Sequence, residues 1–465
     1  MTSTLPRPDT RAYVTVNPAT GELVKEFPSL TDAETQAVLQ RAHEAFLSWR
    51  RTTAAERAGL FSTLAELVQA NAVELGRLVS LEMGKPAGQA VYEAGMASSI
   101  AGWFAENGEA LLADEEVQVP GFRQAVTRRE PVGVILAIEP WNAPLYQAMR
   151  AAAPNLMLGN TVLLKPAEIT AGSTLFLVSL FEQAGFPADV IQTALVSTDQ
   201  VSTLVSDARV RGLTLTGSDR AGSAVGEQAG RHIKPAVLEL GGSDAFVVLD
   251  SADVAKAAGT ASACRLAFGG QVCASPKRVI VTEKVADDFI AQFNAAFGNQ
   301  QVGDPFDPST TIGPLSSQAA VDLLQDQYQD AIDKGATVLV EGGRVDGIGA
   351  YFKPAVITDI TPEMRLYSEE AFGPLAMIFR VPDADGAIQL ANDSIYGLGG
   401  TVFGEDVEEA RAVAGQLDTG MVGVNNFLGG PIEIPFGGTK RSGYGRELGK
   451  SAMDQFANIK TYGIA

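Results

Sequence analysis

Apolar positions in the first part of the chain recur at helical spacing. Residues 32–49 and 54–83 carry Ala and Leu in this pattern, which predicts helices up to about residue 113. From residue 132 the pattern changes, and short apolar runs alternate with helical stretches. The predicted strands are 132–138, 161–164, 190–194, 211–215 and 236–240, and the predicted helices are 145–158, 173–183 and 220–230. This alternation predicts βαβ units and a parallel sheet.

A second alternating block follows the first. Its predicted elements are a strand at 246–249, a helix at 253–266, a strand at 278–282 and a helix at 286–297, with more α/β pattern to about residue 424. Residues 115–129 and the tail 456–464 are extended, and Pro120–Gly121 predicts a hairpin turn. We therefore expect two α/β domains that meet near Gly241–Gly242, joined by a small β element.

Composition narrows the class of protein. The chain has 465 residues, of which 46% are hydrophobic and 19% charged, so it can bury a large core. Its formal net charge of −20 disfavours nucleic acid and membrane surfaces as partners. Residues 1–14 lack the apolar core of a signal peptide, and no run of about 18 apolar residues predicts a membrane span. We expect a cytoplasmic protein.

Several common sites are excluded by their motifs. The chain has two cysteines, which are too few for a disulfide scaffold. The spacing of these cysteines and the two histidines fits no zinc finger, so no metal site is expected. No G-x-G-x-x-G follows the strand 132–138, and the glycine pair at 217 and 222 lacks the lysine of a P-loop. The chain has no G-x-S-x-G and no H-E-x-x-H.

Cys273 is the best candidate for a reactive group. It follows the pair Gly269–Gly270, which allows the backbone to approach a ligand closely, and it lies four residues before Lys277, where a thiolate is favoured. The alternative is a small core residue, which fits Cys264 better because Cys264 lies in an apolar helical pattern.

Motifs in a fixed order give the chain a family resemblance. Gly270–Gln271–Val272–Cys273 resembles the nucleophile motif of the NAD(P)-dependent aldehyde dehydrogenase superfamily, and Leu238–Glu239–Leu240–Gly241–Gly242 resembles its general-base motif. Further blocks of the family stand at 140–142, 165–168, 216–218, 303–305, 312–315, 369–374, 435–438 and 442–443. The likeness runs from about residue 17 to the tail, and it is greatest to the short bacterial succinate-semialdehyde dehydrogenases.

The resemblance implies a specific α/β fold. It has two Rossmann-like parallel-sheet domains and a small β element for oligomerisation. The NAD-binding domain is expected at residues 1–112 and 132–240, the catalytic domain at 241–447, and the oligomerisation element at 113–131 and 448–465. A homodimer or homotetramer is expected.

The resemblance also implies a mechanism. Cys273 matches the nucleophile that attacks the aldehyde, Asn142 the amide that stabilises the oxyanion, and Glu239 the base that activates water to hydrolyse the thioester. Asn142 could instead be a turn residue, and Glu239 a salt-bridged residue at a strand end. Glu239 disfavours a coenzyme-A-acylating enzyme, because that branch tends to lack this carboxylate.

Cofactor contacts carry over by position. The residues that match the family's dinucleotide contacts are Trp141, Lys165, Glu168, Gly217, Ser218, Glu370 and Phe372. Glu168 would accept hydrogen bonds from ribose and repel a 2′-phosphate, so NAD is favoured and NADP is allowed. Ser218 could also be an ordinary helix cap, and Phe372 could be a core residue.

The substrate is indicated by Arg150. It stands where succinate-semialdehyde dehydrogenases have an arginine suited to the distal carboxylate, and it shares a helix face with Tyr146. The alternative is a surface arginine. Phe268, Ala143 and Ser275 depart from the family pattern, which leaves the size of the substrate open.

The expected activity is NAD-dependent oxidation of a carboxylated aldehyde, with succinate semialdehyde first, to the acid. The alternatives are a dehydrogenase of broad aliphatic or aromatic specificity, which would not need Arg150, and a non-catalytic structural protein on the same fold.

Overall fold

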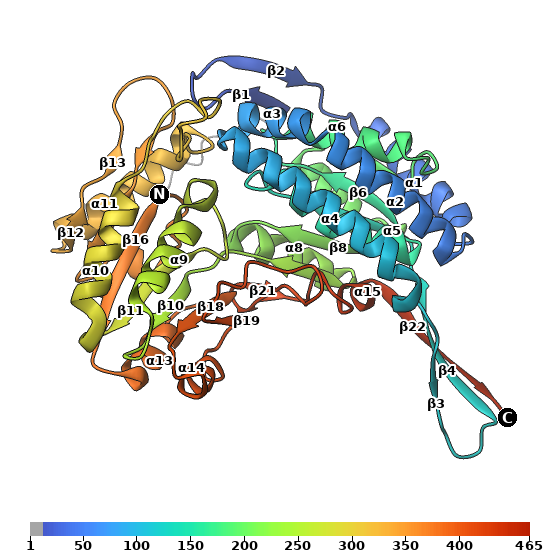
Figure 1. Cartoon of the computed structure of the whole chain (residues 1–465). Helices are drawn as coiled ribbons and strands as arrows, with labels where there is room; N and C mark the ends of the chain where they lie inside the picture. Colours follow the sequence, from blue (N-terminus) through green and yellow to red (C-terminus); the bar gives the residue numbers. More distant parts are fainter. Residues whose placement is uncertain (1–12) are drawn as a thin grey trace, which may run out of the picture.

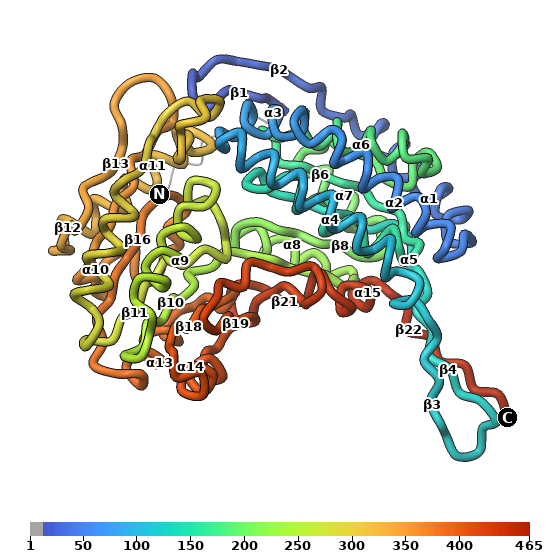
Figure 2. The backbone as a smooth tube through the Cα atoms, in the orientation of Figure 1, coloured from blue at the N-terminus to red at the C-terminus, as the bar shows by residue number. Residues whose placement is uncertain are grey.

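A computed structural model describes residues 13–465 of the chain. Two α/β lobes lie side by side, and a long β arm projects from one of them (Figure 1). The C-terminus lies at the tip of the arm (Figure 2). This architecture confirms the predicted α/β class with two largely parallel sheets.

The first lobe is built on a six-stranded sheet. Its strand order is β21 (Gly443–Tyr444), β9 (Ala236–Glu239), β8 (Val210–Thr216), β5 (Val134–Ile138), β6 (Thr161–Lys165) and β7 (Ile191–Thr193). All pairs are parallel except β21 with β9. The chain runs outward from β5 through β6 to β7 and then returns to β8 and β9 on the other side. The switch between β5 and β8 opens a crevice at the carboxyl ends of these strands, where ligands bind in open α/β sheets.

The second lobe contains a seven-stranded sheet. Its order is β12 (Thr337–Val340), β15 (Ala355–Thr358), β16 (Leu375–Val381), β11 (Pro276–Thr282), β10 (Asp244–Val248), β18 (Gly399–Phe403) and β19 (Met421–Val424). Only β12 with β15 is antiparallel. Because β9 of the first lobe leads within a few residues into β10, the carboxyl edge of one sheet meets the amino edge of the other.

The arm is a three-stranded antiparallel sheet. It consists of β22 (Ala457–Ile464), β4 (Gln124–Pro131) and β3 (Glu115–Val117), and all eight residues of β22 pair with β4. The predicted hairpin and extended tail therefore form one sheet. Three further two-stranded sheets are β1 (Tyr13–Val16) with β2 (Leu23–Phe27), β13 (Gly343–Arg344) with β14 (Phe352–Lys353), and β17 (Tyr396–Gly397) with β20 (Thr439–Lys440).

Helices cover both sheets. Those of the first lobe are α1 (Asp32–Trp49), α2 (Ala54–Ala70), α3 (Ala72–Met83), α4 (Ala87–Leu111), α5 (Pro144–Leu158), α6 (Ala171–Gln183), α7 (Thr198–Ser206) and α8 (Asp219–Arg231). The others are α9 (Val254–Leu266), α10 (Glu283–Gly298), α11 (Gln318–Asp333), α12 (Arg365–Ser368), α13 (Ala384–Asn392), α14 (Val407–Ala414) and α15 (Ala452–Gln455). A short 3-10 turn, η1 (Ala267–Gly270), follows α9.

The helical pattern predicted at residues 54–83 is two helices in the structure. They meet at Asn71, whose backbone departs from helical angles and whose side-chain amide donates to the Leu67 carbonyl at 2.8 Å. A side chain that satisfies the end of one helix locally allows the next helix to start in a new direction. The spacing of apolar residues alone does not predict such a break between two helices.

A buried ion pair fixes the start of α5. The side chains of Lys85 and Glu93 are fully buried and paired. Glu93 Oε1 also accepts the backbone N–H groups of Leu145 at 2.8 Å and Tyr146 at 3.3 Å. These amides are among the first of α5, where a helix has no internal acceptors for them and favours negative charge. Glu93 therefore anchors α5 and the loop that precedes it.

No helix among residues 13–465 is long and apolar enough to cross a membrane.

Replacing Glu93 with Ala is expected to lower the free energy of unfolding by about 3–5 kcal/mol, because Lys85 is left as a buried charge without its partner. Urea unfolding followed by circular dichroism measures the change. The double variant Lys85→Met, Glu93→Met removes both charges and should lose less stability than the single variant. A single variant within about 1 kcal/mol of the wild type would contradict the anchoring role.

Candidate active site

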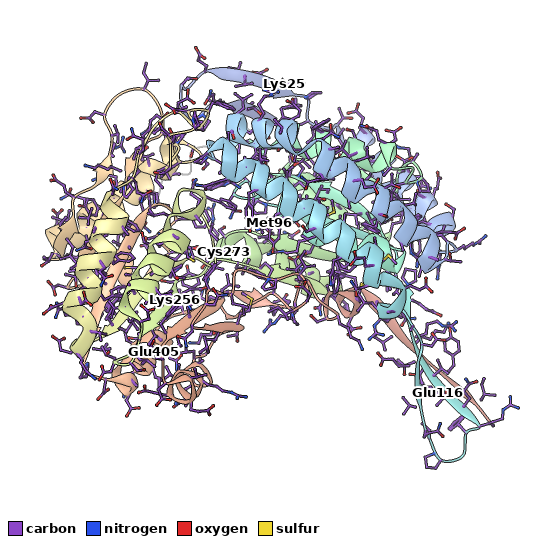
Figure 3. The ribbon with its side chains drawn as sticks, in the orientation of Figure 1. Lys25, Met96, Glu116, Lys256, Cys273 and Glu405 are labelled. Atoms are coloured by element: carbon purple, nitrogen blue, oxygen red, sulfur yellow. The ribbon has the colours of Figure 1, made fainter. Side chains whose placement is uncertain are left out.

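A cleft of about 580 Å³ lies where the two sheets meet. The first lobe contributes the carboxyl ends of β5, β8 and β9, and the second contributes the segments that precede β11 and β16. Of the residues proposed from the sequence, those that line it are Trp141, Asn142, Gly217, Ser218, Glu239, Cys273, Glu370 and Phe372. Cys273 lies at the centre of the molecule, whereas Glu116 lies far away on the arm (Figure 3).

The segment before Cys273 has an unusual backbone. Phe268, Gly269 and Gly270 all have positive φ angles, between 53° and 74°. A Cβ atom on Gly270 would lie 2.4 Å from the Gly373 carbonyl oxygen, so this position needs glycine for space as well as for conformation. Arg265 braces the segment by donating to the Gly270 carbonyl and the Ser275 hydroxyl, each at 2.9 Å.

Asn142 and Cys273 come together through this segment. The Asn142 amide donates to the Gln271 carbonyl at 2.9 Å, two residues before the cysteine. Burial raises the pKa of the Cys273 thiol to about 11, and the positive charges of Lys277 and Arg150 oppose this rise. The thiol is therefore protonated at neutral pH in this state, and any added positive potential favours the thiolate.

Glu239 ends strand β9 and is 2% exposed. Neither of its carboxyl oxygens has a hydrogen-bond partner among the described residues. Burial raises the pKa of Glu239 well above its usual value, Arg150 lowers it, and Glu447 raises it. A carboxyl group with a raised pKa in a dry site suits a general base or acid at neutral pH.

Arg150 is 1% exposed, so its interpretation as a surface residue is wrong. Its guanidinium forms an ion pair with Glu447 and lies over the rings of Phe436, at 4.4 Å, and Tyr146, at 5.3 Å. Arg150 and Tyr146 are not among the residues that line the cleft. They lie on α5 behind it, and the sequence prediction that they bind a carboxylate stays a prediction.

A third buried carboxyl group was missed by sequence reasoning. Glu139 is the first residue after β5 and is 4% exposed, and its pKa is strongly raised by burial and by the neighbouring Glu447. Glu139 and Glu239 flank Thr216, because β5, β8 and β9 are adjacent strands. The only available signal was a carboxylate directly after a fully apolar run.

The expected cofactor residues fall into two groups. Ser218 caps α8, its hydroxyl accepting the Ala221 N–H at 3.3 Å, so the N-terminus of a helix opens on the cleft, and such an end favours anions. The rings of Trp141 and Phe372 meet edge to face, with centroids 5.6 Å apart. Lys165 and Glu168 form an ion pair at 3.3 Å at the end of β6, and neither is among the residues that line the cleft.

The cleft fits a dinucleotide in its chemistry. The α8 N-terminus and Gly217 offer backbone donors for phosphates, and the carboxylate of Glu370 faces the cleft as an acceptor for hydroxyl groups. Within residues 13–465 no cluster of His, Cys, Asp or Glu is arranged to hold a metal ion.

Comparisons with known proteins agree with this geometry. A family model described as the aldehyde dehydrogenase family matches residues 6–462. A succinate-semialdehyde dehydrogenase of Deinococcus radiodurans, with NADP(+) in its name, is 47% identical over 98% of this chain and 95% of that protein. A protein of Mycobacterium tuberculosis strain H37Rv, named likewise, is 44% identical over 97% of this chain and 99% of that protein.

Solved structures share the whole fold. Succinic semialdehyde dehydrogenase of Streptococcus pyogenes, in complex with NADP+, superimposes with a TM-score of 0.95 at 38% identity, over 97% of this chain and 100% of that one. A salicylaldehyde dehydrogenase of Pseudomonas putida G7, complexed with salicylaldehyde, reaches a TM-score of 0.93 at 32% identity, over 99% of this chain and 96% of that one. The chain belongs to the aldehyde dehydrogenase family.

Proposed function

We propose that this aldehyde dehydrogenase oxidises succinate semialdehyde, or a similar aldehyde that bears a carboxylate, to the acid. The observation that carries the chemistry is the meeting of Cys273, Asn142 and Glu239 in one cleft. The relatives named as succinate-semialdehyde dehydrogenases, which are 44–47% identical over almost the whole chain, support the substrate.

In the first step the Cys273 thiolate attacks the aldehyde carbon and forms a C–S bond, and the carbonyl oxygen becomes an oxyanion. Asn142 donates one amide N–H to Gln271, and an amide nitrogen carries two, so the second is free for the oxyanion. The backbone N–H of Cys273 is the second proposed donor. Such fixed donors are each worth about 3–4 kcal/mol in comparable sites.

A nicotinamide dinucleotide, when bound, accepts the hydride that leaves the substrate carbon. The residues proposed to hold it are Trp141, Lys165, Glu168, Gly217, Ser218, Glu370 and Phe372. NADP is supported by the names of the relatives. Glu168 argues for NAD, but its ion pair with Lys165 offsets part of the negative charge that a 2′-phosphate would meet.

Glu239 then acts on the thioester. As a carboxylate it takes a proton from water, whose oxygen attacks the thioester carbon and releases the acid and the Cys273 thiolate. Burial without hydrogen-bond partners raises the pKa of Glu239 and makes it a stronger base once it is ionised.

A second candidate substrate class is supported by the surroundings of Arg150. Arg150 is paired with Glu447 and is not among the residues that line the cleft. A neutral aldehyde, which needs no positive charge, therefore also suits this site. The structural likeness to a salicylaldehyde dehydrogenase favours the same alternative.

The arm is proposed as the oligomerisation element, with residues 113–131 and 448–465, in a homodimer or homotetramer. Strands β3 and β22 are the two edges of the arm sheet, and Val117, Ile459 and Ile464 are exposed on them. Exposed edges and apolar side chains favour association with another copy. The limits of the other two domains likewise remain those proposed from the sequence.

The variant Glu239→Gln is expected to lower kcat by about 100- to 10,000-fold, because it removes the base for hydrolysis but leaves Cys273 able to react. Rapid mixing should then show one burst of reduced cofactor, with the acyl group retained on Cys273 in the mass spectrum. In the wild type, kcat should fall as the pH drops through the raised pKa of Glu239, since the protonated form cannot act as a base. A variant that turns over normally would exclude Glu239 as the base.

Succinate semialdehyde should be preferred over butanal by about 10- to 100-fold in kcat/KM, as expected for a charge-assisted contact to Arg150. The variant Arg150→Met should abolish this preference. The ratio of the two substrates is measured within each variant, so a change in the folded fraction cancels. Equal rates on the two aldehydes, unchanged by the variant, would favour the dehydrogenase of broad specificity.

The variant Glu168→Ala should raise the ratio of kcat/KM for NADP to that for NAD by about tenfold, because it removes a negative charge near the adenosine ribose. Initial rates with each cofactor at saturating aldehyde measure the ratio. Exchanging Glu182, a carboxylate on α6, for Ala is the matched control. An unchanged ratio in Glu168→Ala would place this side chain away from the 2′ position.

A further inference from the structure

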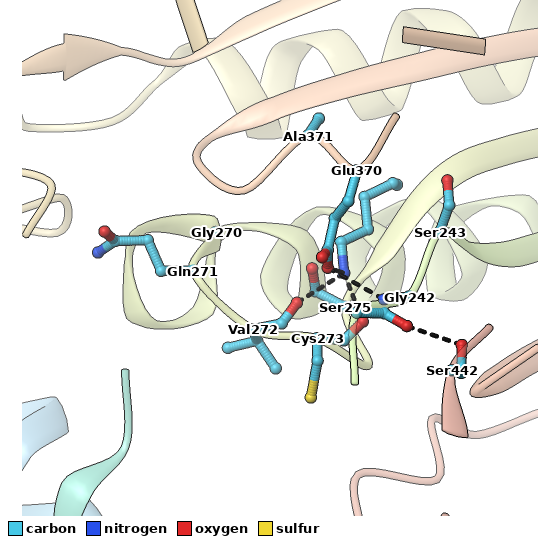
Figure 4. Close-up of polar contacts among 12 residues, drawn as sticks. Gly242, Ser243, Gly270, Gln271, Val272, Cys273, Ser275, Glu370, Ala371 and Ser442 are labelled. Carbon is cyan, nitrogen blue, oxygen red and sulfur yellow. Dashed lines mark hydrogen bonds and ion pairs between the residues drawn. The ribbon is translucent and has the colours of Figure 1, made fainter. Parts of the chain in front are cut away.

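Lys277 is a buried lysine in contact with the nucleophile segment. It is the second residue of β11, and its side chain is fully buried. Its ammonium donates to the carbonyl oxygens of Val272, at 2.7 Å, and Cys273, and it forms an ion pair with Glu370 at 3.0 Å. The hydrogen bonds around Glu370 and this segment are drawn in Figure 4.

The three acceptors match the three N–H groups of an ammonium. Two of these acceptors are the carbonyl oxygens of the peptide groups before and after Cys273. The third is the carboxylate of Glu370, in the segment before β16. A buried charge needs such partners, and they fix its position in turn. Lys277 therefore connects the backbone of Cys273 to the carboxylate of Glu370, which lies about a hundred residues later in the chain.

Glu370 lies between Lys277 and the cleft. It lines the cleft, its side chain is 16% exposed, and it accepts the Gly242 N–H at 3.2 Å. Figure 4 shows the Cys273 sulfur pointing to the side away from Glu370. The backbone of Cys273 thus contacts the ion pair, while the thiol is left free for chemistry.

Charged groups reach Cys273 from four elements. Lys277 on β11 and Arg150 on α5 favour its thiolate, whereas Glu370, before β16, and Glu239 on β9 oppose it. Of the two positive charges, Lys277 has the larger effect on the pKa of the Cys273 thiol. Asp244 on β10 is a further buried carboxyl group near Lys277.

We propose that Lys277 is a positioning residue of the reaction: it holds the peptide groups around Cys273 and supplies the positive potential that favours the thiolate, with Glu370 as its counter-ion. This proposal rests on the proposed function, because it takes Cys273 as the nucleophile. It assigns to Glu370 an effect on the nucleophile besides its expected contact with the dinucleotide.

The proposal makes opposite predictions for the two members of the ion pair. The variant Lys277→Met removes the positive charge, so the pKa of the Cys273 thiol should rise. The variant Glu370→Gln removes the opposing negative charge and leaves Lys277 unneutralised, so that pKa should fall. A residue with a purely structural role would not shift the two profiles in opposite directions.

The test is the rate of alkylation of Cys273 by iodoacetamide, without cofactor, as a function of pH. The full chain is used with Cys264→Ala, so that only one thiol reacts. At about pH 8 Lys277→Met should react about tenfold more slowly, corresponding to about one pKa unit. Glu370→Gln should react faster than the parent at the same pH.

Two further variants serve as controls. Lys277→Arg keeps the charge and should restore most of the alkylation rate at neutral pH. Lys256→Met changes an exposed lysine on α9 in the same way and should leave the profile unmoved. Circular dichroism and thermal unfolding establish that each protein is folded.

The proposal is overturned if Lys277→Met leaves the alkylation rate unchanged, or if Lys277→Met and Glu370→Gln shift the rate in the same direction. If Lys277→Met does not fold, Glu370→Gln decides alone, and an unmoved profile overturns the proposal. The proposed function has its own test in Cys273→Ser. An active Cys273→Ser enzyme would refute the mechanism, whereas an inactive one with unmoved alkylation profiles in the other variants would refute only the role of Lys277.

Discussion

Close packing at Gly241 and Gly242 is the constraint on which the site depends. A Cβ atom on Gly241 would lie 2.5 Å from the Glu370 carboxylate, and one on Gly242 would lie 2.7 Å from the Cys273 carbonyl oxygen. Both distances are shorter than real contacts, so a side chain at Gly241 would displace the Glu370 carboxylate and one at Gly242 would displace the backbone at Cys273. The two glycines join β9 to β10, and their lack of side chains lets the carboxyl edge of one sheet meet the amino edge of the other. Glu239, Cys273 and Glu370 face one cleft because of this contact.

Burial then gives these side chains their properties. Three carboxyl groups, Glu139, Glu239 and Glu447, surround the guanidinium of Arg150 with almost no exposure to solvent. A single positive charge cannot compensate three negative ones in a medium of low dielectric constant, so protons remain on some of the carboxyl groups. Burial is the main cause of the raised pKa values of Glu139 and Glu239, and the negative charge of Glu447 adds to it while Arg150 opposes it. A base near its useful range therefore follows from the packing of the site as a whole.

The sequence predicted what depends on local pattern. The apolar run before Glu139 predicted β5, and alternation predicted two parallel sheets. The nucleophile and general-base motifs indicated Cys273 and Glu239, which the structure brings to one cleft, although their roles remain proposals. Contacts over long sequence separations were beyond this reasoning. The partner of Arg150 is Glu447, nearly three hundred residues away, and the break at Asn71 depends on one side-chain hydrogen bond. Lys277 was noticed as a nearby charge, but its contact with Glu370 required the arrangement of β11 beside β16.

The ion pair of Arg150 with Glu447 does not by itself prevent binding of a substrate carboxylate. A guanidinium has five N–H groups in a planar fork, and one carboxylate uses at most two of them. In the structure Arg150 contacts Glu447 through Nε and Thr216 through Nη2, the latter at 3.4 Å. Thr216 itself lines the cleft, so this side of the guanidinium is nearest to an incoming ligand. A second carboxylate there would add the negative charge of the substrate to a cluster already short of positive charge. A carboxylate bound at this place would therefore favour the protonated forms of Glu139 and Glu239, so the proposed recognition of the substrate and the proposed general base would be coupled electrostatically.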